Sequence, residues 1–192
     1  MLENKKEWYY LVDAITRIDF LILNFLQENI KNTLLDRIMI FITSLGNMSM
    51  VWIIIGIYLL INKKYRKYGI MLFISLLLCA IVGNLTLKPL VARIRPFNAM
   101  PLIDGLLIKA PLDYSFPSGH TMCSFAPAIV LCYMNKRVGI CAVILSTLIG
   151  FSRLYLYVHY PSDVVSGAII GILLGTLSIY LCNMIVNKNN LI

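Results

Sequence analysis

The segment Ser152–Asp163, SRLYLYVHYPSD, places an arginine, a histidine and an aspartate between two long apolar stretches. Arg153 carries a planar, permanently charged donor fork that suits phosphate oxygens. Asp163 follows His159 by four positions, but Pro161 lies between them and disfavours one regular helix through both. We therefore expect Asp163 to cap the last apolar helix and to reach back to His159, which leaves the other ring nitrogen as a base or nucleophile. The plainer alternative is a helix cap beside an interfacial aromatic ring.

A second polar cluster, KPLVARIRP at 88–96, follows an apolar stretch. Lys88 and Arg95 are seven residues apart, so on a helix they would share a face about 10 Å apart along the axis. From that face both side chains would converge on one anion. Pro89 and Pro96 interrupt helix hydrogen bonding, which is tolerated where the backbone is buried in protein or lines a cavity. The alternative is that both cations extend to lipid headgroups.

A third cluster, SFPSGH at 115–120, opens the next apolar stretch. Pro117 suits the first position of a helix, where its missing N–H is not needed. The amides of Ser118, Gly119 and His120 would then be among the unpaired donors of a helix start. Such donors favour an anion, and Gly119 lets a ligand approach the backbone closely. The alternative is an ordinary helix entry with a structural histidine.

Taken together, the three clusters describe one site better than three unrelated features. The chain has two histidines, and both lie in these clusters. Three strong cations, a helix-start amide cluster and two imidazoles can position and neutralise a phosphoryl group without a metal. One imidazole must begin neutral and the other cationic, so we expect their environments to differ.

The clusters resemble, in order and completeness, the three-part signature of the type-2 phosphatidate phosphatases, which include membrane lipid phosphatases. The signature residues lie between Lys88 and Asp163, and the surrounding helices extend the resemblance over roughly 45–186. The resemblance implies that His159 attacks phosphorus and becomes a phosphohistidine, with Asp163 supporting its ring. His120 would protonate the leaving oxygen and then activate water. The nonbridging oxygens would be held by Lys88, Arg95, Ser118, Gly119 and Arg153, with no metal or other cofactor.

Composition places this chemistry in a membrane. Of the 192 residues, 59% are hydrophobic and 14% are charged, and the mean hydropathy is +0.81. The net charge of +8 would suggest nucleic acid in a soluble protein. Here most cations fall in short segments between apolar runs, so we interpret them as loop anchors and expect no nucleic-acid partner. The five cysteines lie scattered in apolar stretches, which favours small buried side chains over a disulfide framework or a zinc site.

The hydrophobic pattern predicts an all-α integral membrane bundle of five to six transmembrane helices. Four stretches qualify well, a fifth is apolar over most of its length, and a sixth span would have to come from the first 47 residues. Residues 1–47 contain two apolar-rich runs of only about ten positions, which are typical of amphipathic helices at the interface. We therefore divide the chain into these N-terminal interfacial helices at 1–47 and a transmembrane phosphatase core at 48–192, with no removable signal peptide. The predicted spans are 48–62, 68–92, 119–135, 138–157 and 163–186.

The loop charges predict which side the site faces. Residues 63–67 and 136–137 are basic, so they are expected in the cytoplasm. Because spans alternate sides, segments 88–118 and 152–163 must then face outward, away from the cytoplasm. These outward segments contain five cations of their own: Lys88, Arg93, Arg95, Lys109 and Arg153. The excess of basic residues in the cytoplasmic loops is therefore meaningful only if some of these five serve the site.

We therefore predict a metal-independent phosphatase of the plasma membrane that acts on a lipid phosphate at the outer leaflet. Undecaprenyl diphosphate is the favoured substrate, with phosphatidylglycerophosphate or phosphatidate as the other choices. This choice comes from analogy, since no residue separates a monophosphate from a diphosphate or indicates an oligomeric state. The main alternative is a phosphate-lipid binding or transport protein without turnover. A soluble-type haloperoxidase is disfavoured by the spans, and a zinc hydrolase by the neighbouring cations.

Overall fold

The structure is a computed structural model that describes residues 2–189, and the described part of the chain is helical without any strand. The predicted all-α class is therefore confirmed. In chain order the elements are α1 (Leu2–Asn29), α2 (Thr33–Leu45), the 3₁₀ turn η1 (Asn47–Ser49), α3 (Met50–Ile61), α4 (Arg66–Cys79), the π-helical segment η2 (Ala80–Leu87), α5 (Lys88–Val91), α6 (Pro96–Ala99), α7 (Gly119–Met134), α8 (Lys136–Tyr155) and α9 (Pro161–Asn189).

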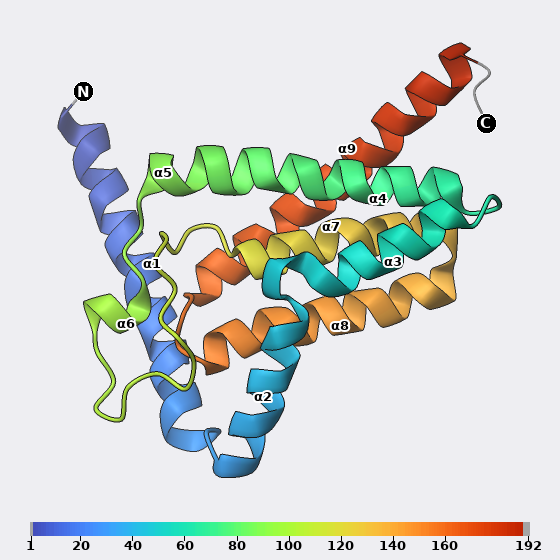
Figure 1. Ribbon diagram of the computed structural model, residues 1–192. Helices are drawn as coiled ribbons and strands as arrows, with labels where there is room; N and C mark the ends of the chain where they lie inside the picture. The colour runs from blue at the N-terminus through green and yellow to red at the C-terminus, as the bar shows by residue number, and fades with distance from the viewer. Residues whose placement is uncertain (1, 190–192) are drawn as a thin grey trace.

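Helix α7 lies at the centre of the bundle and packs against α4, α8 and α9 (Figure 1). Its contact with α9 is close because Gly167, Gly171 and Gly175 recur every four residues along one face of α9. A Cβ at these positions would lie only 2.5–2.8 Å from carbonyl oxygens at the start of α7 or within it. Small residues at this spacing let two helix backbones approach. The starts of both helices are aligned as a result, and the Ser118 amide donates to the Asp163 carbonyl at 3.1 Å.

Three helices of the described chain are long and apolar enough to cross a membrane: Arg66–Ala99, Lys136–Tyr155 and Pro161–Ile185. The predicted span at 48–62 does not qualify alone, because α3 has only 12 residues. Helices α2 and α3 are long and apolar enough to cross a membrane only when they are taken together, across a bend of 48°. Helix α7 is apolar but has 16 residues. The described residues thus contain three to four candidate spans, and the count of five to six stays a prediction.

The first basic cluster does not form the single helix expected from its spacing. Helix α5 ends at Val91, and Ala92 adopts a left-handed φ of 48° that turns the chain. Arg95 is then extended, with ψ at 153°, as expected for a residue that precedes proline. Lys88 and Arg95 therefore reach the same region from a helix and from the strand-like turn after it. The prediction of a shared helical face was wrong because the proline and the left-handed turn break the helix.

Helix α1 crosses the end of the bundle at which α5, α6 and the 100–118 segment lie (Figure 1). It is held there by Asp19, which is only 2% exposed. The Asp19 carboxylate accepts from Nη2 of Arg93 at 2.7 Å and from the Ser162 amide at 2.9 Å. Arg93 also donates to Asp163 at 2.7 Å, and its guanidinium lies 3.9 Å from the centroid of the Tyr160 ring. One buried ion-pair network thus joins α1 to the start of α9.

This network yields a prediction about stability. Asp19→Asn removes the charge that faces Arg93, and breaking a buried pair costs about 3 kcal/mol. The thermal midpoint of the detergent-solubilised protein should fall by roughly 6–12 °C. Asp13→Asn is the matched control, because the 2.9 Å pair of Asp13 with Arg17 on the same helix is exposed and its loss should shift the midpoint by less than about 2 °C. Equal shifts in the two variants would contradict the anchoring role of Asp19.

Candidate active site

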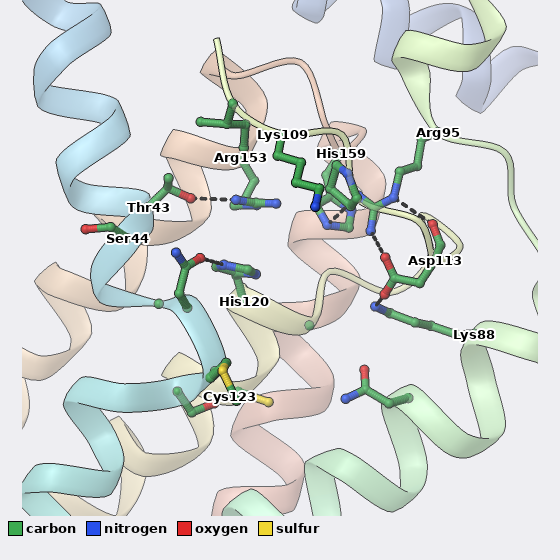
Figure 2. Close-up of a pocket in the computed structure, with 18 of the residues that line it drawn as sticks. Thr43, Ser44, Lys88, Arg95, Lys109, Asp113, His120, Cys123, Arg153 and His159 are labelled. Carbon is green, nitrogen blue, oxygen red and sulfur yellow. Dashed lines mark hydrogen bonds and ion pairs between the residues drawn. The ribbon is translucent and has the colours of Figure 1, made fainter. Parts of the chain in front are cut away.

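A cavity of about 470 Å³ opens at this end of the bundle. Its walls come from α2, η1, η2, α5, α7, α8 and the loops before α6, α7 and α9. The structure brings six of the eight predicted site residues into its lining, from all three sequence clusters (Figure 2). They are Lys88, Arg95, Gly119, His120, Arg153 and His159. The other two, Ser118 and Asp163, lie behind the wall.

The His159 ring is held in a defined tautomer. Its Nε2 lies 3.1 Å from Nη1 of Arg95. A guanidinium has only donors, so Nε2 must accept this hydrogen bond and carry a lone pair, and the proton resides on Nδ1. Nδ1 lies 3.5 Å from Oδ2 of Asp163, close enough for an electrostatic contact, but it has no hydrogen-bond partner among the described residues. The nitrogen with the lone pair is thus covered by a cation, and the nitrogen with the proton faces a carboxylate.

Asp163 is held from several sides. Its Oδ2 accepts from the Ser115 hydroxyl and from the Tyr160 amide at 3.0 Å, while Oδ1 accepts from Arg93. The bond to Tyr160 reaches from the third position of α9 back to its first flanking residue, as in a capping box. The expected double role of Asp163, as helix cap and as neighbour of His159, is thus present geometrically.

Burial is the main influence on the charge of His159, which is only 1% exposed. Loss of hydration disfavours the imidazolium, and the nearby guanidinium groups of Arg95 and Arg153 add to this effect, although Asp163 opposes it. The net result lowers the pKa of His159 to about 3. The ring is therefore neutral at physiological pH, as a nucleophile must be.

A carboxylate occupies the cationic side of the cavity. Asp113 forms ion pairs with Lys88 and, at 2.6 Å, with Nη2 of Arg95, and the Asp113 carbonyl accepts from Nε of Arg95 at 2.8 Å. Burial disfavours ionisation of Asp113, but the two cations outweigh it and lower the pKa of its carboxyl to about 2. Asp113 is half exposed to the cavity, so it lies where an incoming anion would contact the same two cations.

Arg153 enters the cavity from α8 and is 3% exposed. Its Nη1 donates to the Thr43 hydroxyl on α2 at 2.6 Å, whereas its buried Nε has no partner among the described residues. A buried charged donor without an acceptor is costly unless a ligand satisfies it. Lys109, an exposed residue of the 100–118 segment, points into the same space beside His159 (Figure 2). Both cations are therefore available to an anion.

The helix-start cluster is only partly as expected. Helix α7 begins at Gly119, and Ser118 is its N-cap. The Ser118 amide is already used by the Asp163 carbonyl, and its buried hydroxyl pairs with the Thr121 hydroxyl at 2.9 Å, so Ser118 does not reach the cavity. Gly119 does reach it, and a Cβ there would lie 3.7 Å from Nζ of Lys88. A side chain at this position would therefore narrow the space between Lys88 and the start of α7.

His120 occupies the side of the cavity opposite Lys88 and Asp113 (Figure 2). Its Nε2 lies 3.0 Å from the side-chain oxygen of Asn47 in η1. The two histidines thus have different partners, whereas the expectation that one ring is neutral and the other cationic stays a prediction. One faces a guanidinium and a carboxylate, and the other faces a neutral amide.

Sequence reasoning missed several residues that complete the site. Asp113 lies two positions before the third cluster, and an acidic residue in an outward segment rich in cations was the available signal. Arg93 was noted only as one of the loop cations. Thr43 and Asn47 gave no signal, because single small polar residues in a segment assigned to the interface suggest no partner.

The fold and this site together define a helical membrane phosphatase. The family model of the PAP2 superfamily matches residues 64–186, well over half of the chain, and the chain belongs to that superfamily. Among curated proteins it is 36% identical over 146 residues to an undecaprenyl-diphosphatase from Sulfolobus acidocaldarius, covering 76% of this chain and 69% of that protein.

Two solved structures are similar along most of their length. Aquifex aeolicus LpxE has a TM-score of 0.71 at 31% identity, covering 84% of this chain and 94% of its own. A transmembrane PAP2-type phosphatidylglycerolphosphate phosphatase from Bacillus subtilis has a TM-score of 0.70 at 26% identity, and the match covers 92% of this chain and 88% of that chain. The predicted family and the prediction of a phosphatase are confirmed.

The position of the Asp113 carboxylate predicts that it competes with bound anions for Lys88 and Arg95. Asp113→Asn removes the charge that occupies Lys88 and Arg95, so orthophosphate should inhibit the variant roughly ten-fold more strongly than the parent. The measurement is the inhibition constant of orthophosphate with a fixed substrate. Asp104→Asn, an exposed change in the same segment, serves as control and should leave that constant unchanged. Weaker inhibition of Asp113→Asn would mean that Asp113 organises the cations without competing for them.

Proposed function

We propose that this protein hydrolyses a membrane lipid diphosphate at the outer leaflet through a phosphohistidine on His159, without a metal. The observation that carries the proposal is the 3.1 Å contact of Arg95 with Nε2 of His159, which identifies Nε2 as the nitrogen with the lone pair and shows a cation beside it. An anion that draws Arg95 onto its own oxygens uncovers the lone pair at the moment it binds.

The first chemical step would then be an in-line displacement. Nε2 of His159 forms a bond to phosphorus, and the bond from phosphorus to the leaving oxygen breaks. His120, across the cavity, gives a proton to that oxygen. The charge on the nonbridging oxygens is neutralised by Lys88, Arg95 and Arg153 and by the Gly119 amide. In the second step His120 takes a proton from water, which attacks the phosphohistidine and releases phosphate.

A diphosphate is favoured by the charge of the cavity. Four cations line it against the single carboxylate of Asp113 among the described residues: Lys88, Arg95, Lys109 and Arg153. A lipid diphosphate carries more negative charge than a monophosphate and matches this excess better. The similarity to an undecaprenyl-diphosphatase points the same way, so undecaprenyl diphosphate is our first choice, ahead of phosphatidylglycerophosphate and phosphatidate.

An outward-facing site in the plasma membrane is supported by the charge asymmetry of the bundle. The basic connections after α3 and α7 lie at the end away from the cavity (Figure 1). Cytoplasmic placement of those connections puts the cavity on the opposite side. Helix α1 crosses the cavity end (Figure 1) and exposes large apolar side chains, which supports our proposal that residues 1–47 form interfacial helices ahead of a spanning core at 48–192. We retain five spans plus these helices as the proposed topology.

The substrate assignment is tested by phosphate release from a panel of lipids. Purified protein should hydrolyse undecaprenyl diphosphate with a higher kcat/KM than phosphatidate or phosphatidylglycerophosphate. His159→Ala should lose at least about 10³-fold, because no nucleophile remains. Binding of the lipid by this variant should persist. Undiminished hydrolysis by His159→Ala would defeat the mechanism, and a preference for a monophosphate would defeat only the substrate choice.

Inhibitors test the metal-independent phosphohistidine mechanism separately from the choice of lipid substrate. Orthovanadate should inhibit at concentrations far below that of substrate, because it can take the five-coordinate geometry of the transition state opposite His159. EDTA should leave the rate unchanged, because the cations supply the charge that a metal would otherwise provide. Insensitivity to vanadate, or loss of activity in EDTA that added metal restores, would rule out the proposed route.

A further inference from the structure

We infer that Asn47, held by the turn Gly46–Ser49 between α2 and α3, is a positioning residue that sets the His120 imidazole for proton transfer. The inference rests on the proposed function. Oδ1 of Asn47 lies 3.0 Å from Nε2 of His120, and both residues line the cavity. This turn lies outside all three sequence clusters and outside the residues 64–186 matched by the family model.

The hydrogen bond decides which nitrogen of His120 meets the substrate. An amide oxygen only accepts, so Nε2 carries a proton that stays with Asn47. Nδ1 is then the nitrogen that exchanges protons. From the imidazolium, Nδ1 gives its proton to the leaving oxygen as the bond between phosphorus and oxygen breaks. The lone pair left on Nδ1 takes a proton from water as the water oxygen bonds to phosphorus and the bond to His159 breaks, which restores the imidazolium.

The backbone of the turn is shaped around this contact. Met48 and Ser49 have left-handed φ values of 49° and 57°, which cost non-glycine residues about 1–3 kcal/mol each. Such strain persists only where the surroundings impose it. Gly46 is also required, because a Cβ there would lie 2.8 Å from Cδ2 of His120 and 2.9 Å from Cγ2 of Ile149. His120 is therefore hydrogen-bonded by one residue of the turn and packed directly against the backbone of the preceding one.

The arrangement explains why the helix breaks here. A continuous helix through 33–61 would satisfy the backbone better in a membrane than a 48° bend does. The bend brings an amide to His120, on the opposite side of the cavity from the Asp163 carboxylate that backs His159. A neutral acceptor suits a residue that alternates between acid and base, because it orients the ring without fixing a charge on it.

Leaving-group dependence separates positioning of the acid from a structural role. A dialkylglycerol phosphate expels an alkoxide that must be protonated, whereas p-nitrophenyl phosphate expels a phenolate that need not be. Asn47→Leu should lower kcat/KM on the order of 100-fold for the lipid and less than about three-fold for the aryl ester. Asn47→Asp keeps the acceptor and should retain lipid hydrolysis within about five-fold of the parent. Gly46→Ala, which displaces the ring, should reproduce the Asn47→Leu pattern.

Asn98→Leu, an exposed change in α6 at the same end of the bundle, is the matched control and should leave both rates unchanged. If Asn47→Leu lowers kcat/KM equally for the two esters, or for neither, the inference is overturned. The proposed function would still stand in that case, because it is tested by His159→Ala. If Asn47→Leu does not fold, the same two esters are compared with Gly46→Ala, which should lose hydrolysis of the lipid selectively, and with Asn47→Asp, which should retain it. A parent protein that hydrolyses neither ester nor a lipid diphosphate would overturn the proposed function, and the inference with it.

Discussion

The concentration of positive charge in one small cavity is the constraint on which the rest of this structure depends. Two like charges about 4 Å apart repel by about 4 kcal/mol near a protein surface. Lys88 and Arg95 are held together because Asp113 pairs with both, and Arg153 is held by the Thr43 hydroxyl. Each of these three cations therefore has a protein partner in the absence of an anion. The cavity as a whole keeps an excess of positive charge, which is complementary to a highly charged anion.

The packing of the helices fixes the positions of the residues around this charged cavity. Close packing of α9 on α7 aligns the two helix starts, so that Gly119 lines the cavity and Asp163 lies directly behind its wall. Arg93 then ties Asp163 to Asp19 on α1, which gives the N-terminal helix a direct connection to the carboxylate behind His159. Lipid-exposed helices contribute little hydrophobic driving force among themselves, so such small-residue contacts and buried ion pairs are the interactions expected to maintain this geometry.

The two histidines are prepared for complementary tasks by what each ring nitrogen contacts. In His159 the proton faces a carboxylate and the lone pair faces Arg95, in a buried and neutral ring. In His120 the Nε2 nitrogen faces an amide oxygen, to which it can only donate a proton. Membership of the PAP2 superfamily is consistent with this division, because phosphoryl transfer depends mainly on positioning and charge neutralisation.

The sequence by itself determined the family, the helical class, the membrane location and six residues that line the cavity, because these depend on side-chain type and on apolar runs of sufficient length. Tertiary structure alone decided that Ser118 turns away, that Lys88 and Arg95 meet across a broken helix, and that Asp113, Thr43 and Asn47 complete the site. Those features arise from left-handed turns and from partners 18 to 110 residues apart. Local spacing carries no information about such contacts, since they exist only once the helices have packed.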